Sequence, residues 1–251
     1  MQLIRSITAL LITPPLTLLV SLLALADLTL GRKSPSRAMV FPRIWGRIIC
    51  RLIGARVRVE GLEKLEKGKT YIFAGNHASQ VDIFAFQGYF PYDFRWIAKK
   101  ELFAIPVFGP AMRLAGFIPI DRSRGRQAMQ SLIEAAEKIR SGTSVIIFPE
   151  GTRSRDGRLR QFKTGAVLLA IKAGVDIVPL GFIGTHDVLP KGHLLARSGN
   201  VTIRIGAPVS TRDYTPRQKK ELAALLHDRV AALLDGDTTG ETASAQPDAA
   251  A

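Results

Sequence analysis

An apolar segment near the N-terminus constrains this chain more than any other feature of its sequence. From Ser6 to Ala26 the chain runs for 21 residues without a charged side chain. A helix of that length crosses the ~30 Å hydrocarbon core of a bilayer. Pro14 and Pro15 stand inside the segment, and because proline removes a backbone donor they are expected to bend or break such a helix. The sequence leaves two arrangements open for residues 6–26: one transmembrane helix, or a re-entrant hairpin in one leaflet.

A cleaved signal peptide is a third interpretation, because the small-residue pattern Ala24-Leu25-Ala26 ends the apolar run. The residues that follow argue against it. Between Asp27 and Glu60 there is no acidic residue, and the basic residues there are Arg32, Lys33, Arg37, Arg43, Arg47, Arg51, Arg56 and Arg58. Positive charge just after an apolar segment holds that flank in the cytoplasm. We therefore expect an uncleaved anchor with the rest of the chain on the cytoplasmic side.

The chain as a whole is both basic and apolar. It has 35 Lys and Arg against 21 Asp and Glu, a net charge of +14, and 47% of its residues are hydrophobic. This charge indicates an anionic partner: a nucleic acid, a phospholipid surface or a phosphorylated substrate. We expect no nucleic acid, because no helix-turn-helix or aromatic RNA-binding pattern is present. The single cysteine, Cys50, excludes disulfide-stapled scaffolds, and the four histidines lack paired zinc spacing, so no metal is expected.

Residues 35–54 have the pattern of a basic amphipathic helix. Arg43, Arg47 and Arg51 recur every four residues beside an apolar face. A helix with this pattern suits the anionic headgroups of a membrane surface. A helix packed on the domain with a solvated polar face would explain the same spacing.

Short strand patterns then alternate with helical patterns. The strand-like runs are 57–59, 71–74, 94–98, 116–120, 144–148, 177–182 and 201–205. The clearest helices are 127–141 and 216–234, the second preceded by a capping-box pattern of Thr215 and Gln218. This alternation predicts an α/β fold, with a mostly parallel mixed sheet flanked by helices. We expect a membrane-anchoring helical region over 1–54, an α/β domain over 55–235 and a disordered tail over 236–251.

A histidine and an aspartate follow the strand pattern at 71–74. His77 and Asp82 are five residues apart, which is about 140° around a helix, so inside one helix their side chains would diverge. They meet if His77 lies in the turn and Asp82 in the first turn of the next helix. Asp82 would then fix the imidazole tautomer and leave the other nitrogen as a general base. The helix dipole alone also favours an acid at this position.

A second polar block follows the strand pattern at 144–148. Gly151, Thr152 and Arg153 offer backbone donors, a hydroxyl and a planar guanidinium, which together suit a phosphate monoester. Glu150 is a poor ligand for an anion, and we expect it to hold an arginine side chain. A solvated loop with a run of charges would explain the same residues.

Together these blocks resemble the glycerolipid acyltransferase family over about residues 43–234. In chain order, the blocks that carry the resemblance are Asn76-His77-x4-Asp82, Gly116-Phe117-Ile118-Pro119-Ile120-Asp121-Arg122, Phe148-Pro149-Glu150-Gly151-Thr152-Arg153 and Val178-Pro179-Leu180. The resemblance implies transfer of a fatty acyl group from an acyl thioester to the sn-2 hydroxyl of 1-acyl-glycerol-3-phosphate, giving phosphatidic acid in phospholipid biosynthesis. Another lysolipid acceptor, such as a lyso-ornithine lipid or a lysophospholipid, is the alternative. A non-enzymatic peripheral membrane protein is the alternative outside the family.

The resemblance also implies roles for individual residues. His77 would deprotonate the acceptor hydroxyl and Asp82 would orient it. Arg122, Gly151, Thr152 and Arg153 would hold the phosphate beside Glu150, and Lys100 would face the acyl donor or the developing charge. No cofactor is implied, because acyl-CoA or acyl carrier protein serves as co-substrate. The implied location is the bacterial inner (cytoplasmic) membrane, on an anionic membrane surface with the catalytic domain facing the cytoplasm.

Overall fold

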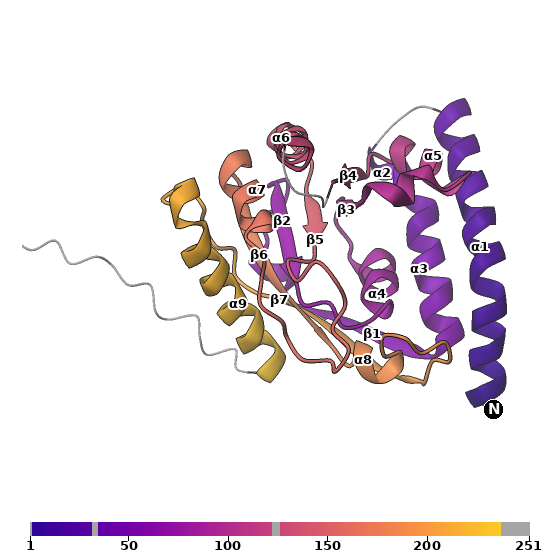
Figure 1. The fold of residues 1–251 in the computed structure, drawn as a ribbon. Helices are drawn as coiled ribbons and strands as arrows, with labels where there is room; N and C mark the ends of the chain where they lie inside the picture. Colours follow the sequence, from indigo (N-terminus) through magenta and orange to yellow (C-terminus); the bar gives the residue numbers. More distant parts are fainter. Residues whose placement is uncertain (1, 32–34, 122–125, 237–251) are drawn as a thin grey trace, which may run out of the picture.

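A seven-stranded sheet organises the α/β part of the chain (Figure 1). The computed structural model describes residues 2–31, 35–121 and 126–236. The strands are β1 (Ala55–Glu60), β2 (Tyr71–Gly75), β3 (Arg95–Lys99), β4 (Ile118–Ile120), β5 (Val145–Ile147), β6 (Asp176–Ile183) and β7 (Gly199–Ile205). Their order is β1-β7-β6-β2-β5-β3-β4, and of these neighbours β6 and β7 are antiparallel while the other pairs are parallel. The predicted mostly parallel mixed sheet is confirmed.

Helices cover both faces of this sheet. One face carries α6 (Arg126–Arg140), α7 (Gly165–Ala173) and α9 (Lys219–Asp235); the other carries α3 (Val40–Ile53) and α4 (Val81–Tyr89), with α1 (Gln2–Leu30) and α5 (Phe108–Leu114) beyond them (Figure 1). The shorter elements are α2 (Pro35–Ala38), α8 (Thr185–Val188), η1 (Leu62–Lys64), η2 (Lys100–Ala104) and η3 (Pro216–Gln218). Thr215 and Gln218 form the predicted capping box. The tail expected to be disordered, from residue 237 on, lies outside the described residues.

α1 is one continuous helix of 29 residues with Pro14 and Pro15 in its interior. The expected break at the two prolines is therefore wrong, and so is the hairpin that depended on it. Each proline removes one helical hydrogen bond, but α1 packs along α3 and α5, and neighbouring helices stabilise proline-containing helices in membrane proteins. At 1.5 Å per residue α1 is about 44 Å long. It is the single helix in the described part of the chain that is long and apolar enough to cross a membrane.

Large aliphatic side chains of α1 point away from the protein. Its exposed residues include Leu3, Ile4, Ile7, Leu10, Leu11, Leu18, Leu19, Leu22 and Leu23. The side chains it buries against the protein are mostly small: Ser6, Ala9, Ser21 and Ala24, with Leu28. A surface helix of a water-soluble protein has the reverse arrangement, whereas small residues at helix contacts are typical of membrane proteins.

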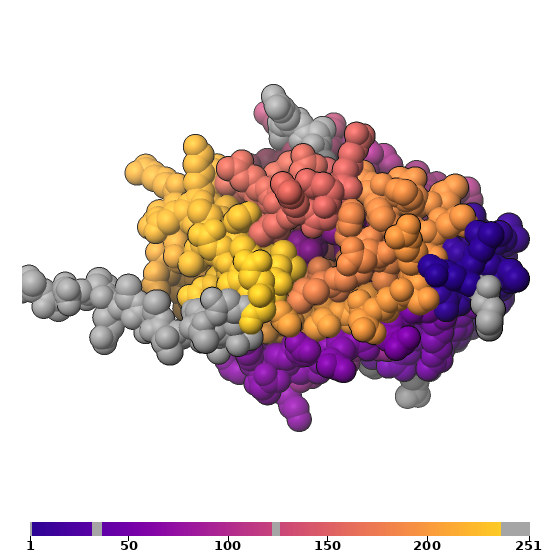
Figure 2. Space-filling view, turned by 90° about the horizontal axis from the view of Figure 1, so that it is seen from below, coloured from indigo at the N-terminus to yellow at the C-terminus, as the bar shows by residue number. Residues whose placement is uncertain are grey.

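Both ends of α1 contact the α/β domain. In Figure 2 the indigo N-terminal end of α1 borders orange segments of the domain. Near this end, the Arg5 guanidinium donates to the hydroxyl of Ser198, just before β7. Near the other end, Leu28 packs in a cluster with Ala115 and Phe117. The helix thus lies alongside the domain, with contacts near both of its ends.

Two arginines of α3 bind backbone carbonyls near the end of α4. Arg43 donates to the carbonyls of Pro91 and Tyr92 at 2.9 and 2.7 Å, and Arg47 donates to the carbonyl of Gly88 at 2.7 Å. The last carbonyls of a helix lack partners within it, and these carbonyls lie at the end of α4 or just after it. Arg47 is nevertheless exposed, so the expectation of a basic face on headgroups stays a prediction. Arg51 remains exposed.

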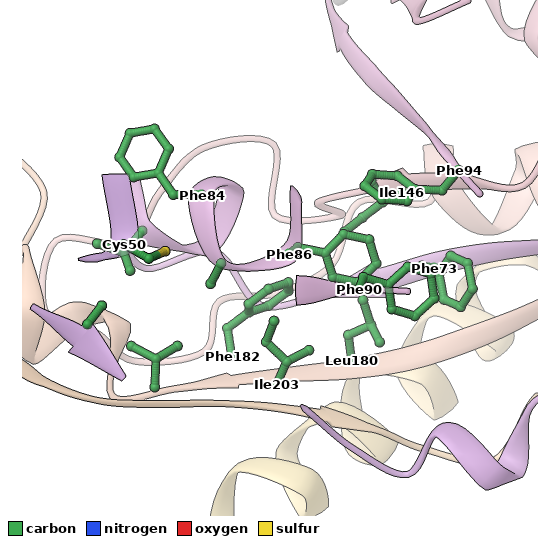
Figure 3. Packing of buried hydrophobic residues seen from close by; sticks show 14 of the residues in the cluster. Cys50, Phe73, Phe84, Phe86, Phe90, Phe94, Ile146, Leu180, Phe182 and Ile203 are labelled. Atoms are coloured by element: carbon green, nitrogen blue, oxygen red, sulfur yellow. The ribbon is translucent and has the colours of Figure 1, made fainter. Parts of the chain in front are cut away.

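An aromatic core fixes α4 against the sheet (Figure 3). Alternate residues of β2 face opposite sides, so Phe73 joins the cluster beneath α3 and α4 while Ile72 joins the cluster beneath α6, α7 and α9. On α4, the ring of Phe86 stacks on that of Phe90 with centroids 4.4 Å apart. These contacts hold the helix that carries Asp82.

The backbones of α3 and α4 approach each other closely at two glycines. A Cβ built on Gly88 would lie 2.7 Å from the nitrogen of Arg47, and one built on Gly46 would lie 2.6 Å from the carbonyl oxygen of Phe84. Both neighbours are backbone atoms, so a methyl group at either position must push the helices apart.

We predict that Gly88→Ala destabilises the protein by about 1–3 kcal/mol through overpacking. A loss of stability would be informative, because alanine in place of glycine inside a helix ordinarily stabilises the helix by up to about 1 kcal/mol. Thermal unfolding in detergent measures the difference. Gly165→Ala in α7 is the matched control, since a Cβ there meets no atom within 4 Å. A Gly88→Ala protein as stable as the control would contradict the close helix contact.

Candidate active site

The structure brings His77 and Asp82 together at the carboxyl end of β2. His77 lies in the turn between β2 and α4, and Asp82 is the second residue of α4. The imidazole Nδ1 is 2.8 Å from Asp82 Oδ2. The same carboxylate oxygen accepts the backbone N–H groups of Ala78 and Ser79 at 3.0 and 2.9 Å, and the Asp82 side chain is fully buried. With the Nδ1 proton held by Asp82, Nε2 is the nitrogen left to act as a base.

The main chain of His77 is held from both sides by the loop after β5. Its N–H donates to Glu150 Oε1 at 2.8 Å, and its carbonyl accepts the N–H of Ser154 at 2.8 Å. The parallel register explains why these segments meet, because Ala74 pairs with Ile147 and positions three residues further on are 77 and 150. The carboxyl ends of adjacent parallel strands are where α/β proteins place their sites.

The imidazole ring of His77 also lies flat against Phe148. The ring centroids are 3.8 Å apart and the planes differ by 5°. Asp82 fixes one edge of the imidazole and Phe148 covers one face, so the ring has a defined orientation. The stacking partner escaped the sequence analysis although it stands inside the second motif block, because its role depends on the pairing of β2 with β5.

Glu150 is buried and accepts a hydrogen bond from the backbone of the turn that carries His77. Its Oε1 accepts from His77, while Oε2 is buried without a hydrogen-bond partner. Burial raises the pKa of Glu150 to about 7; the bond from His77 works in the opposite direction, and the nearby Asp82 adds to the rise. The positive charge of Arg160 lowers the pKa of Glu150, against the effect of burial, and the expected task of holding an arginine side chain stays a prediction.

The loop after Glu150 lines a cavity of about 550 Å³ beside His77. Gly151 has a positive φ of 76°, and a Cβ there would lie 3.0 Å from the ammonium nitrogen of Lys163, two reasons for glycine at this position. Thr152 and Arg153 line the cavity with Gly151, and apolar side chains of β3, α4 and α5 line it further on. α1 contributes Thr13, Thr17, Val20, Ser21 and Ala24. The cavity therefore joins polar and apolar surfaces beside one imidazole.

Lys100, another sequence-predicted residue, is not among the described residues that line the cavity. Arg122 falls outside the described residues. Lys100 forms an ion pair with Asp121 at 2.7 Å, and its neighbour Lys99, which the sequence analysis did not assign, lines the cavity. Among the described residues no cluster of three or more His, Cys, Asp or Glu residues could hold a metal ion.

Ser79 and Cys50 belong to residue types that can act as nucleophiles, but both make structural contacts. The hydroxyl of Ser79 donates to the carbonyl of Leu189 at 2.7 Å. Cys50 is fully buried in the apolar cluster beneath α3 and α4, and burial raises the pKa of its thiol to about 12. Neither side chain is therefore placed to act as a nucleophile beside His77.

Comparison with known proteins decides the family. The Acyltransferase family model matches residues 56–183. The chain belongs to this acyltransferase family. It is 37% identical over 190 residues to the 1-acyl-sn-glycerol-3-phosphate acyltransferase of Limnanthes douglasii, which covers 75% of this chain and 67% of that one. The corresponding protein of Borreliella burgdorferi is 29% identical over 184 residues, 73% of this chain and 74% of that one.

A solved structure agrees with the whole fold of this acyltransferase. The crystal structure of the 1-acyl-sn-glycerophosphate acyltransferase from Thermotoga maritima matches with a TM-score of 0.79 and 27% identity. The match covers 94% of this chain and 98% of that one, so it includes the N-terminal helical region as well as the α/β domain.

The buried carboxyl group of this acyltransferase generates a prediction about pH. Because the pKa of Glu150 is raised from 4.5 to about 7, the folded state binds the proton more tightly than the unfolded state does. This contribution to stability is fully present below pH 4.5 and is lost as the pH rises through about 7. Glu150→Gln keeps an oxygen that accepts from His77 and cannot ionise, so it should lose no stability over this range.

Thermal unfolding of both proteins from pH 4 to 9 measures the effect. We expect the difference between Glu150→Gln and wild type to grow in favour of the variant up to about pH 7 and then to level off. Subtracting the two curves cancels the groups that titrate alike in both proteins. Parallel curves would show that the carboxyl group is not buried as described.

Proposed function

We propose that this acyltransferase moves a fatty acyl group from an acyl thioester to the sn-2 hydroxyl of 1-acyl-sn-glycerol-3-phosphate, giving phosphatidic acid in phospholipid biosynthesis. The observation that carries the proposal is the joining of His77 to the loop 150–154 within one cavity. A base fixed beside a phosphate-binding loop suits an acceptor that carries both a hydroxyl and a phosphate. The names of the relatives from Limnanthes, Borreliella and Thermotoga support this choice.

The chemistry needs one base and no covalent enzyme intermediate. His77 Nε2 takes the proton of the acceptor hydroxyl as its oxygen attacks the thioester carbonyl. Asp82 stabilises the imidazolium that forms. Collapse of the tetrahedral intermediate forms the ester and breaks the carbon–sulfur bond, and the departing thiolate receives the proton from His77. The base is thereby restored for the next cycle.

Each of the three loop residues supplies a different donor group to the phosphate. Arg153 offers a planar pair of donors, Thr152 a hydroxyl and Gly151 a backbone N–H. Arg122 retains its predicted part in this site. On the donor side, Lys99 lines the cavity and takes the task that the sequence analysis gave to Lys100. Acyl-CoA and acyl carrier protein both suit the site as co-substrates, and no other cofactor takes part.

Activity of the purified protein in detergent tests the proposal, with a panel of lysolipids offered together with acyl-CoA or acyl carrier protein. We expect His77→Ala to lower the rate of acyl transfer to lysophosphatidate by at least ~10²–10⁴-fold, because one residue acts as both base and acid. Asp82→Asn should also be severely impaired.

The matched control is His227→Ala, since His227 lies on α9, across the sheet from the cavity. It should retain wild-type activity. Transfer by His77→Ala within about threefold of wild type would remove His77 from the mechanism. Preferred transfer to a lyso-ornithine lipid or a lysophospholipid would identify another acceptor, and no transfer to any acceptor would support a non-enzymatic membrane role.

We also propose that α1 anchors the enzyme to the cytoplasmic leaflet of a bacterial inner membrane, with the catalytic domain in the cytoplasm. The outward aliphatic side chains of α1 supply the apolar surface for this. The contacts of Arg5 and Leu28 with the α/β domain favour a helix embedded along its length, in place of a helix that crosses the bilayer. Exposed basic residues such as Arg51 add attraction to anionic lipids.

Labelling of a cysteine at position 2 tests this topology. A Gln2→Cys variant should resist a membrane-impermeant maleimide in intact spheroplasts and react after lysis, because both ends of α1 stay on the cytoplasmic side. Wild type is the control, since its single cysteine, Cys50, is fully buried. Labelling in intact spheroplasts would show that α1 crosses the membrane.

A further inference from the structure

A lysine far along the chain reaches the phosphate-binding loop. Lys191 lies between α8 and β7, and its ammonium group donates to the carbonyl of Arg153 at 2.8 Å and to the hydroxyl oxygen of Thr152 at 3.2 Å. In Figure 2 the segment that contains Lys191, in orange, borders the rose-coloured loop after β5. Thr152 and Arg153 line the cavity beside His77, so Lys191 holds the side chain of one residue of the site and the backbone of the next.

The backbone next to Lys191 is fixed to the catalytic turn. The carbonyl of Leu189 accepts the hydroxyl of Ser79 at 2.7 Å, and Pro190 forms an isolated β-bridge with Ser79. Ser79 in turn donates its N–H to Asp82. Lys191 therefore reaches the loop from a backbone segment that is bonded to Ser79, and Ser79 contacts Asp82, which orients His77.

The charge of Lys191 is not neutralised by a carboxylate. Both of its hydrogen-bond acceptors are uncharged, and within the described ranges it forms no ion pair, whereas Lys69 and Lys100 do. A phosphate monoester brings a charge of about −1.5 to −2 at pH 7. Arg153 supplies one positive charge in the loop, and Lys191 adds a second directly behind it.

The bond to Thr152 also sets the direction of its hydroxyl. A threonine hydroxyl has one donor and two acceptor positions. Because the ammonium group of Lys191 can only donate, the oxygen of Thr152 acts as acceptor toward Lys191. The proton of Thr152 is then free to point to another acceptor, such as a phosphate oxygen in the cavity.

We infer that Lys191 is a positioning residue of the acceptor-phosphate site, which orients Thr152 and Arg153 toward a phosphate and supplies positive charge behind them. This inference rests on the proposed function, because it assumes that the loop binds the phosphate of the acceptor. It adds to the site a residue outside the four motif blocks. A role confined to folding would affect all acceptors equally, whereas this role depends on the phosphate.

Kinetics with Lys191→Met and Lys191→Arg test the inference. Methionine keeps an unbranched side chain without charge, and arginine keeps the charge. With 1-oleoyl lysophosphatidate as acceptor, Lys191→Met should raise KM by ~10-fold or more and change kcat little, since hydrogen bonds to charged groups are worth about that much. Lys191→Arg should recover KM to within about threefold of wild type. Lys138→Met is the matched control, because Lys138 is an exposed lysine on α6, away from the cavity, and it should behave as wild type.

Inhibition by inorganic phosphate gives a second readout that does not depend on the acyl chain. We expect phosphate to compete with lysophosphatidate in wild type, and to inhibit Lys191→Met at least several-fold more weakly. An unchanged KM and unchanged phosphate inhibition in Lys191→Met would overturn the inference. Equal losses of kcat on lysophosphatidate and on 1-oleoyl glycerol, which lacks the phosphate, would also overturn it by showing a structural role. Failure of wild type itself to use lysophosphatidate would instead refute the proposed function.

Discussion

Two hydrogen bonds to the main chain of His77 are the interaction on which the site depends. Glu150 accepts its N–H and Ser154 donates to its carbonyl, so the turn after β2 and the loop after β5 form one unit. The parallel pairing of these strands makes the contact available, because it sets positions 77 and 150 at corresponding places beyond the strand ends. Under the proposed function, a base and a phosphate-binding loop held in this way would select a hydroxyl at a set distance from a phosphate.

The two faces of α1 and the positions of the basic residues explain how the chain can be both basic and apolar. The outer face of α1 exposes aliphatic side chains, while its inner face contributes Thr17 and Ser21 to the cavity beside His77. One helix can thus meet lipid and line the substrate site. Part of the positive charge is structural, since Arg43 and Arg47 bind carbonyls at the end of α4. Another part gathers at the loop that contains Arg153 and at the lysine behind it.

Local patterns predicted much of this structure. The strands and the meeting of His77 with Asp82 could be predicted, because the hydrophobic period and the helix geometry depend on residues that are close in sequence. Other features depend on tertiary contacts that local patterns do not show: α1 continues through Pro14 where it packs on α3 and α5, and the buried Glu150 accepts a backbone N–H from His77. Lys191 escaped notice for the same reason, since its partners lie 38 and 39 residues away.

The positional selectivity of acyl transfer tests most directly whether a fixed base and a fixed phosphate loop define the acceptor. The measurement is the ratio of kcat/KM for 1-acyl-glycerol-3-phosphate and its 2-acyl isomer, in which the free hydroxyl lies one carbon further from the phosphate. We expect the 1-acyl isomer to be preferred by ~100-fold or more, because misplacing a reacting group by about 1 Å costs about that much. Equal values for the two isomers would contradict a rigid link between His77 and the loop.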